Sequence, residues 1–292
     1  MPPHSRDGRT RSRQIAGVLI GLLFANLIVV GAKFTIGLAT GSLAVLGDAV
    51  HASVDAMNNV LALLVMRVAA QAPDEDHPYG HTKFETLGAL AIVVFLSISG
   101  FELVKGAVGR LLSGSQPLDI NQTQIGVLLA TLGINSAVAW YEAKRGRELQ
   151  SDLLLADAGH TRADVFITLG VLVAVVFSRA GYPWVDPLVA IVVAGAIVVI
   201  AYGIIRRSVP VLVDQHVLPA EEIREAVQDI EGVASAYDIR SRSAPDQRFA
   251  ELTIAVDSMA TVQVAHEVAD NVEVRLRERL GFDEIIVHIE PC

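Results

Sequence analysis

Six long apolar segments constrain what this chain can fold into. A helix needs about 20 apolar residues to cross the roughly 30 Å hydrocarbon core of a bilayer. Six windows approach or exceed that length: 15–37, 42–68, 84–111, 123–141, 152–178 and 184–205. The mean hydropathy of +0.47 and the 52% share of hydrophobic residues are also too high for a soluble globular chain. We therefore predict an all-α, six-helix transmembrane bundle over residues 1–209.

The Lys and Arg residues indicate how the spans are oriented. Six spans place both chain ends on one side, and short cytoplasmic loops carry an excess of positive charge. The apolar run that follows the N-terminal arginines is longer than the core of a secretory signal, so we expect a retained first span. Both termini are then cytoplasmic, in an integral protein of the bacterial inner membrane. One face is flanked by Arg6, Arg9, Arg11, Arg13, Arg67, Lys83, Lys144, Arg145, Arg147, Arg206 and Arg207, and the other by Lys33, Lys105, Arg110 and Arg179.

The C-terminal segment has a different chemistry. From Val211 to Cys292 it holds seventeen Asp/Glu against seven Lys/Arg, a charge of −10, so the rest of the chain is about +1 of the total −9. Its patterns predict a helix over 219–230, strands over 235–241 and 249–256, a helix between Thr261 and Gly281, and a strand over 285–289. This αββαβ order predicts a small ferredoxin-like α+β domain over 210–292, in the cytoplasm. The single cysteine, Cys292, excludes an internal disulfide.

A repeated polar pattern lies inside two of the apolar segments. Asp-Ala-x-His-x-x-x-Asp occurs in the second span and again in the fifth. Residues three or four apart share a helix face, so each copy forms one polar stripe. If the stripes meet, one His-x-x-x-Asp pair from each helix forms a four-ligand site that suits a dication such as zinc. The predicted ligands are His51, Asp55, His160 and Asp164, and the supporting carboxylates are Asp48 and Asp157.

Carboxylates at this depth are costly. One Asp at the centre of a membrane helix costs about 2.5 to 3.5 kcal/mol. The alternative is that these side chains only hydrogen-bond between helices and hold the bundle together. Arg162 lies about 200° around the helix from His160 and cannot share the face of the ligands, so its partner stays open.

A second polar cluster follows the second span. The segment Asp74-Glu-Asp-His-Pro-Tyr-Gly-His81 contains two imidazoles and three carboxylates. From its residues alone it is either a solvated acidic loop or a ligand cluster that captures metal before it enters the bundle.

These motifs together resemble the cation diffusion facilitator family of divalent-metal/proton exchangers. The resemblance rests on Leu46-Gly-Asp-Ala-Val-His-Ala-Ser-Val-Asp55, on His160-Thr-Arg-Ala-Asp164 and on the loop 74–81. It implies that the quartet on spans two and five is the transport site. Some bacterial relatives carry Asp at the first position, and the His/Asp quartet resembles the zinc-handling members. Zn²⁺ is therefore favoured, without excluding Cd²⁺, Co²⁺, Mn²⁺ or Fe²⁺.

The resemblance also implies roles outside the quartet. Asp74, His77 and His81 would bind an ion, and Lys83 and Asp214 would form a salt bridge between the membrane helices and the cytoplasmic domain. A regulatory metal site would use His266, His288 and Glu290, weakened here because Tyr237 and Thr253 stand where zinc-exporting relatives often have His. We expect a homodimer that binds divalent metal ions and protons within the lipid bilayer. We expect no prosthetic group and no nucleic-acid partner, with Zn²⁺ as the transported and regulatory ion.

The predicted function is export of metal in exchange for external protons. Metal binds neutral imidazoles and ionised carboxylates and displaces their protons, and rocking of the bundle exposes the site to the other side. One competing interpretation is an intramembrane metalloenzyme, although the usual His-Glu-x-x-His string is absent. Another is a channel or a metal sensor, although the ligands gather at one depth rather than along a pore.

Overall fold

The computed structural model describes residues 4–40, 43–113 and 121–292. Within these ranges the side chains of residues 4–9, 40, 43–45, 47, 48, 51, 54 and 55 lie outside the description. The chain forms two compact units. One comprises Asp7–Ser208 and the other consists mainly of Val209–Cys292, so each is described by itself.

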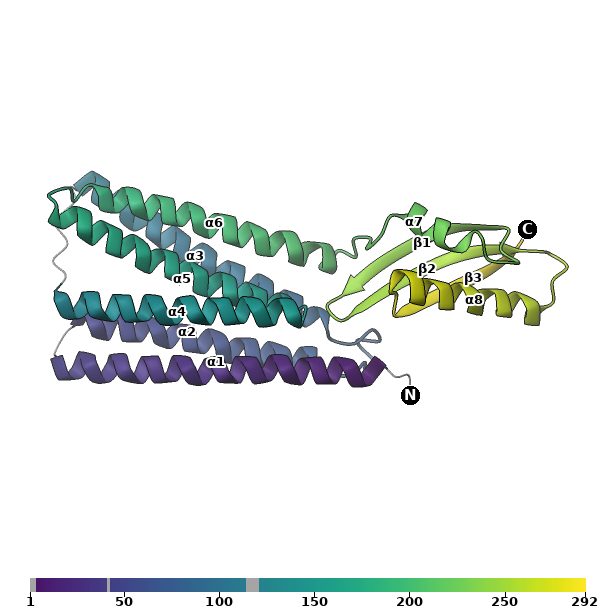
Figure 1. Ribbon diagram of the computed structural model, residues 1–292, viewed down its shortest axis with the longest axis horizontal. Coiled ribbons are helices and arrows are strands. Elements are labelled where there is room, and N and C mark those ends of the chain that lie inside the picture. The colour runs from purple at the N-terminus through teal and green to yellow at the C-terminus, as the bar shows by residue number, and fades with distance from the viewer. Residues whose placement is uncertain (1–3, 41–42, 114–120) are drawn as a thin grey trace. The chain divides into compact units, whose positions relative to one another are not determined.

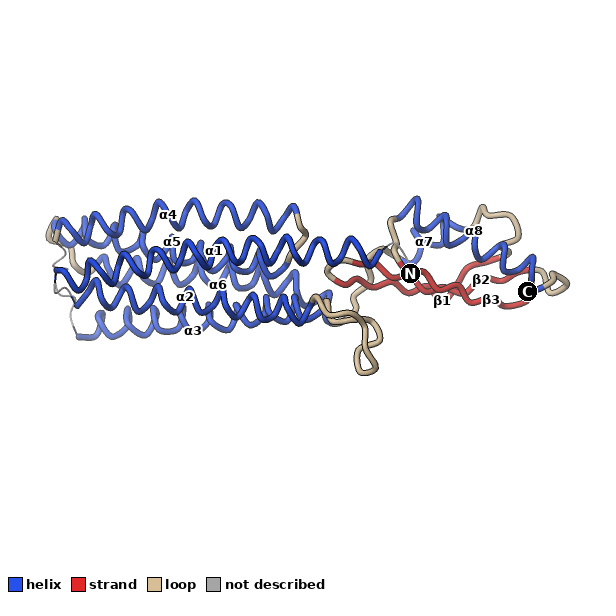
Figure 2. Tube along the Cα trace, turned by 90° about the horizontal axis from the view of Figure 1, so that it is seen from below, coloured by secondary structure: helices blue, strands red, loops and turns tan. Residues whose placement is uncertain are grey.

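The first unit is a bundle of six long helices, as predicted (Figure 1). Helices that follow one another along the chain run antiparallel, as the colours of Figure 1 show, and all six lie side by side in the view of Figure 2. Most extend beyond the apolar windows, because hydropathy reports the part that lies in lipid and not the polar turns that continue the helix. The helices are α1 (His4–Thr40), α2 (Leu43–Ala69), α3 (Lys83–Ser113), α4 (Gln122–Glu148), α5 (Asp152–Arg179) and α6 (Val185–Leu212).

The helices have the length and composition of membrane spans. Over the described residues, five of them are long and apolar enough to cross a membrane. The remaining helix, α2, is 27 residues long. Its fully described part includes the apolar helix Ala56–Ala69, while the preceding turns hold the residues whose side chains are outside the description.

Helix α5 occupies a central place in the bundle. It packs against α3 and α4, and α3 packs in turn against α2. Leu153 and Leu154 of α5 are fully buried in a core shared with Leu19, Leu96 and Ile197. The contact of α2 with α3 requires a small residue at Gly88, because a Cβ there would lie 2.6 Å from a side-chain carbon of Val65. Close approach at small residues is typical of helix packing in membranes.

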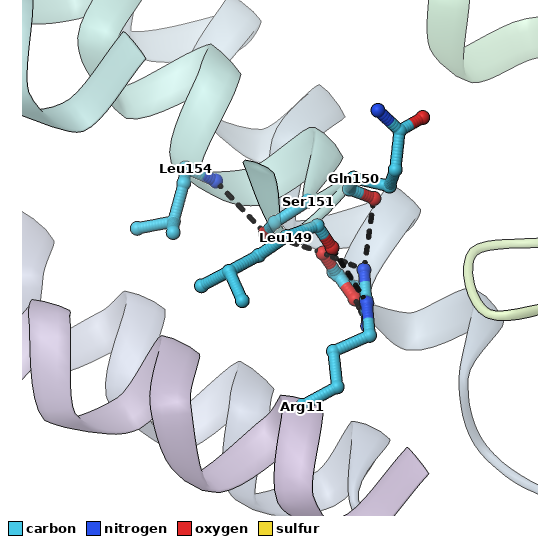
Figure 3. A network of polar contacts seen from close by, with 6 residues as sticks. Arg11, Leu149, Gln150, Ser151 and Leu154 are labelled. Atoms are coloured by element: carbon cyan, nitrogen blue, oxygen red, sulfur yellow. Dashed lines mark hydrogen bonds and ion pairs between the residues drawn. The ribbon is translucent and has the colours of Figure 1, made fainter. Parts of the chain in front are cut away.

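A buried ion pair joins the starts of three helices at one end of the bundle (Figure 3). Arg11 of α1 donates from Nη1 to Glu85 Oε2 at 2.8 Å and from Nη2 to Oε1 at 3.2 Å. The same guanidinium donates to the carbonyl oxygens of Leu149 and Gln150, which follow α4. Ser151, the N-cap of α5, donates to Glu85 Oε1 at 2.5 Å. Since only 1% of the Glu85 side chain is exposed, this network fixes α1, α3 and the α4–α5 turn together.

The second unit has the predicted αββαβ order. It contains α7 (Ala220–Val227), β1 (Ser235–Ala244), β2 (Gln247–Val256), α8 (Val262–Leu280) and β3 (Glu284–Pro291). The strand order is β1-β2-β3, with β1 antiparallel and β3 parallel to β2. Helix α8 supplies the crossover that a parallel pair requires.

The predicted limits of α8 are confirmed. The Thr261 side chain accepts a hydrogen bond from the backbone N–H of Val264, and Gly281 ends the helix with a left-handed φ of 69°. The strands are longer than predicted because β1 and β2 continue pairing up to the turn between Ala244 and Gln247.

Candidate metal sites

The polar stripe of α5 faces a small buried cavity. His160 is 9% exposed and Asp157 4% exposed, and His160 Nε2 lies 3.9 Å from Asp164 Oδ2. All three residues line a cavity of about 30 Å³. That volume holds a single water molecule or ion, since a water needs at least about 10–15 Å³. The stripe therefore offers one imidazole and two carboxylates to a guest of ionic size.

Helix α2 reaches the same cavity. Asn58 Nδ2 lies 3.4 Å from His160 Nε2, and Asn59 lines the cavity. Among the described residues, the buried Nδ2 of Asn59 has no hydrogen-bond partner. The two helices that carry the repeated pattern are therefore neighbours at the level of His160, as a shared site requires.

The α2 half of the predicted quartet is known only as backbone. His51 and Asp55 lie on α2 two turns and one turn before Asn58 and Asn59. The side chains of Asp48, His51 and Asp55 lie outside the described residues. The four-ligand site composed of His51, Asp55, His160 and Asp164 therefore stays a prediction, with its α5 half placed.

Several polar residues of this cavity were missed from the sequence. Asn26, Asn135 and Thr161 line it together with Asn59. Glu142 of α4 does not line the cavity, but it is almost fully buried and accepts a hydrogen bond from Thr161 Oγ1 at 2.9 Å. The sequence offered one signal for these residues: each is a polar residue inside an apolar helix. Such a residue in a membrane helix usually faces the interior of the bundle.

The loop between α2 and α3 gathers three predicted ligands. The ligand atoms of Asp74, His77 and His81 all lie within 4.8 Å of one another. Asp74 Oδ1 is 3.1 Å from His77 Nδ1, and Asp74 Oδ2 is 3.4 Å from His81 Nε2. Two imidazole nitrogens and a carboxylate are a ligand set suited to zinc-like dications. Where the sequence left a solvated loop as the alternative, the structure brings the three groups together.

The loop holds these groups by its backbone and by ring packing. The backbone N–H of His77 donates to Asp74 Oδ1 at 2.7 Å, and this bond is the main cause that lowers the pKa of Asp74 below its ordinary value. His81 is only 4% exposed, and its ring stacks on Phe84 with centroids 5.8 Å apart. Within the described part of the chain, the buried His81 Nδ1 has no hydrogen-bond partner. Gly80 permits the turn, with a φ of 82°.

Comparison with known proteins decides the family. Residues 19–213 match the model of the cation efflux transmembrane domain, and residues 218–292 match that of the cation efflux protein's cytoplasmic domain. The chain belongs to the cation diffusion facilitator family. It is a divalent-cation efflux transporter and an integral membrane protein, and its family consists of transporters and not of enzymes. The intramembrane metalloenzyme is thereby excluded.

Relatives of this family member come from plants and bacteria. It is 32% identical to metal tolerance protein C1 of Arabidopsis thaliana, over 92% of this chain and 61% of the relative. It is 30% identical to the cation-efflux pump FieF of Salmonella newport, over 87% of this chain and 85% of the relative. It is 25% identical to the manganese efflux system protein MneS of Bacillus subtilis, over 94% of this chain and 95% of the relative.

In the C-terminal domain of this cation diffusion facilitator, the predicted regulatory ligands lie on two elements. His288 and Glu290 of β3 lie 3.5 Å apart, and His266 of α8 lies 3.9 Å from Asp270, one turn along its own helix. Tyr237 donates a hydrogen bond to Glu290 Oε2 at 2.6 Å. This bond is the main cause that raises the pKa of Tyr237 above its ordinary value. Tyr237 thus uses one of the carboxylate oxygens, and the regulatory site stays a prediction.

The two residues of this family member that are predicted to form a salt bridge between the membrane helices and the cytoplasmic domain lie in different units. Lys83 is the first residue of α3, and Asp214 follows α6 in the second unit. Asp214 Oδ1 lies 3.9 Å from Arg242 Nη1 of β1. Because the two units are described separately, the pair Lys83–Asp214 stays a prediction.

Proposed function

We propose that the transporter exports Zn²⁺ from the cytoplasm in exchange for external protons, through a site formed by His51, Asp55, His160 and Asp164. The observation that supports this most directly is the His160–Asp164 pair beside α2, whose side chains are 11% and 17% exposed. Their Nε2 and Oδ2 atoms lie 3.9 Å apart, and Asn58 of α2 lies 3.4 Å from the same imidazole nitrogen. An imidazole and a carboxylate from each helix supply the four nitrogen and oxygen ligands of a tetrahedral zinc ion.

The coupling to protons follows from the same ligands. Metal binds neutral imidazole and ionised carboxylate, so loading the site displaces any protons that these groups carry. Release on the more acidic side is promoted because protonation of an imidazole removes its ligand lone pair. Rocking of the helices between two openings then gives alternating access, driven by inward protons.

The remaining predicted residues fit into this cycle. Asp74, His77 and His81 capture the ion at the end of the bundle where α2 ends and α3 begins. Residues 1–209 then carry transport, and residues 210–292 pair two copies into a homodimer. Metal at His266, His288 and Glu290 would bias the rocking of the bundle, which makes the C-terminal domain a sensor of cytoplasmic metal load. Both chain termini are cytoplasmic in this proposal.

One observation favours a second cargo, Mn²⁺. The side-chain amides of Asn26, Asn59 and Asn135 line the cavity beside the carboxylates. Amide and carboxylate oxygens suit manganese, which accepts more ligands than zinc. A relative at 25% identity is a manganese efflux protein. The His160 imidazole, whose Nε2 lies 3.4 Å from Asn58 Nδ2 of α2, is the reason to place zinc first.

The deciding experiment is transport in reconstituted vesicles with an imposed pH gradient, for Zn²⁺, Mn²⁺, Cd²⁺, Co²⁺ and Fe²⁺ separately. The native protein should move zinc fastest, and collapse of the gradient should stop net accumulation. Asp164→Ala should abolish transport, because it removes a ligand oxygen, and His51→Asp should broaden the choice of ion towards manganese.

The matched control is Thr168→Val, one turn beyond Asp164 on α5. The Thr168 hydroxyl donates to the backbone carbonyl of Asp164, so its loss leaves the ligands in place. Full transport by Asp164→Ala would refute the site. Transport that ignores the pH gradient would refute the exchange, and unchanged selectivity in His51→Asp would refute the role of the imidazole.

A further inference from the structure

A cavity of about 180 Å³ lies between α5 and α6. On α5 it is lined by Gly159 and Arg162, whereas His160 and Asp164 line the cavity of about 30 Å³ described above. The two cavities therefore lie on different faces of α5, as a rotation of about 100° per residue dictates. Arg162 therefore lies on the face of α5 that is turned towards α6, and not on the face of the predicted metal ligands.

The charges of this cavity are mainly positive. Its lining includes the guanidinium groups of Arg162 and Arg207 and one carboxylate, Asp152. Arg162 lies ten residues after the start of α5, which is about 15 Å along the helix. A guanidinium on an exposed face at that depth is unfavourable in lipid unless an anion or the interface is within reach. Since Asp152 balances only one of the two arginines, the cavity favours an anionic guest.

The cavity also offers a neutral donor and open space. Ser208 of α6 is 0% exposed, and in the described part of the chain its hydroxyl oxygen has no hydrogen-bond partner. At Gly203 a Cβ atom would meet nothing within 4 Å, so the wall is open at that position. The remaining wall is apolar, with Ile200 and Ile204 beside the arginines. Two guanidiniums and a hydroxyl suit the oxygens of a phosphate group, and the alkyl side chains suit an acyl chain.

We propose that this cavity binds an anionic glycerophospholipid, with its phosphate at Arg162, Arg207 and Ser208 and an acyl chain along Ile200 and Ile204. Basic pockets between membrane helices on the cytoplasmic side bind anionic headgroups, and the long side chain of Arg162 can extend towards Arg207, which lies near the end of α6. A lipid accounts for the apolar part of the wall, which free inorganic phosphate leaves uncovered. The bound lipid bridges α5, which carries the metal ligands, to α6, so its occupancy would influence how α5 moves.

The test is native mass spectrometry of the full-length protein in detergent, titrated with phosphatidylglycerol or phosphatidylcholine. Phosphatidylglycerol should be retained in preference to phosphatidylcholine. Arg162→Gln and Arg207→Gln should each weaken its retention about fivefold. Gly203→Leu should also weaken it, because the new side chain fills the cavity without touching the arginines. Arg206→Gln is the matched control, since Arg206 neighbours Arg207 but does not line the cavity.

Four results would overturn the proposal. The first is equal retention of the two lipids. The second is an equal loss in Arg206→Gln and Arg207→Gln, which would reduce the effect to general surface charge. The third is dissociation of a dimer by Gly203→Leu with unchanged lipid retention, which would assign the cavity to contact between two copies of the chain. Displacement of bound phosphatidylglycerol by inorganic phosphate alone would likewise contradict a lipid as the occupant.

Discussion

Replacement of Arg11 by methionine should destabilise the bundle strongly. Arg11 makes a two-bond ion pair with Glu85, with N···O distances of 2.8 and 3.2 Å, and also donates to two carbonyl oxygens after α4. Methionine keeps much of the side-chain length and removes all four bonds. Glu85 then remains a buried carboxylate that, within the described part of the chain, keeps the hydrogen bond from the Ser151 hydroxyl. Removing one partner of a buried pair typically costs about 3–5 kcal/mol, and we expect Arg11→Met to lie in that range.

The measurement is equilibrium unfolding of the full-length protein in mixed micelles containing increasing amounts of dodecyl sulfate, followed by tryptophan fluorescence. Trp140 of α4 and Trp184 before α6 are the two reporters. The double variant Arg11→Met with Glu85→Met should be clearly more stable than Arg11→Met alone, because the orphaned charge is gone. Arg13→Met is the matched control. Arg13 is exposed on the same helix, so its replacement should change the unfolding free energy by no more than about 0.5 kcal/mol.

Two results would refute this reasoning. If Arg11→Met unfolds within about 0.5 kcal/mol of the native protein, the pair does not hold the helix starts together. If the double variant is as unstable as the sum of the single variants, the two side chains are not coupled, and the loss comes from the separate contacts of each.

The remaining predictions concern the loop and the C-terminal domain. His81→Ala should weaken the binding of Zn²⁺, measured by calorimetry, by at least about tenfold. The variant is made in an Asp164→Ala background, so that the loop is titrated without the membrane site. His216→Ala in the same background is the control, and equal Zn²⁺ affinity in the two variants would show that the loop does not bind the ion. Glu290→Gln should lower the pKa of Tyr237 towards the ordinary value of about 10, because the main cause of its increase is the hydrogen bond to Glu290; ultraviolet titration of tyrosinate, with Tyr237→Phe to identify the signal, measures it. A raised pKa means that folding favours the protonated tyrosine. This contribution to stability is therefore complete below the ordinary tyrosine pKa, and it is lost as the pH rises through the raised pKa of Tyr237. A tyrosinate titration that is the same in Glu290→Gln and in the native protein would contradict the hydrogen bond between Tyr237 and Glu290.

The elements of both units follow from local patterns. The length of the apolar runs predicted six helices, and the change of period after Arg207 predicted the αββαβ domain. Thr261 and Gly281 marked the two ends of α8 because a side-chain cap and a left-handed residue are needed at those positions whatever surrounds them. The cluster of Asp74, His77 and His81 could also be predicted from the sequence, because its three ligands lie within one segment of eight residues.

Contacts between distant segments could not be predicted in this way. Helical spacing placed Asp157, His160 and Asp164 on one face, but it carried no information that Asn26, Asn59 and Asn135 would line the same cavity.

The same limit applies to charged partners. Arg11 and Glu85 are 74 residues apart, and their pairing depends on α1 and α3 starting at the same end of the bundle. Arg162 could be excluded from the face of the ligands, yet its place beside Arg207 depends on how α6 packs against α5. Sequence spacing determines which side chains share a face of one helix, because the backbone geometry is fixed. The tertiary structure decides which faces meet, because that choice depends on packing summed over the whole bundle.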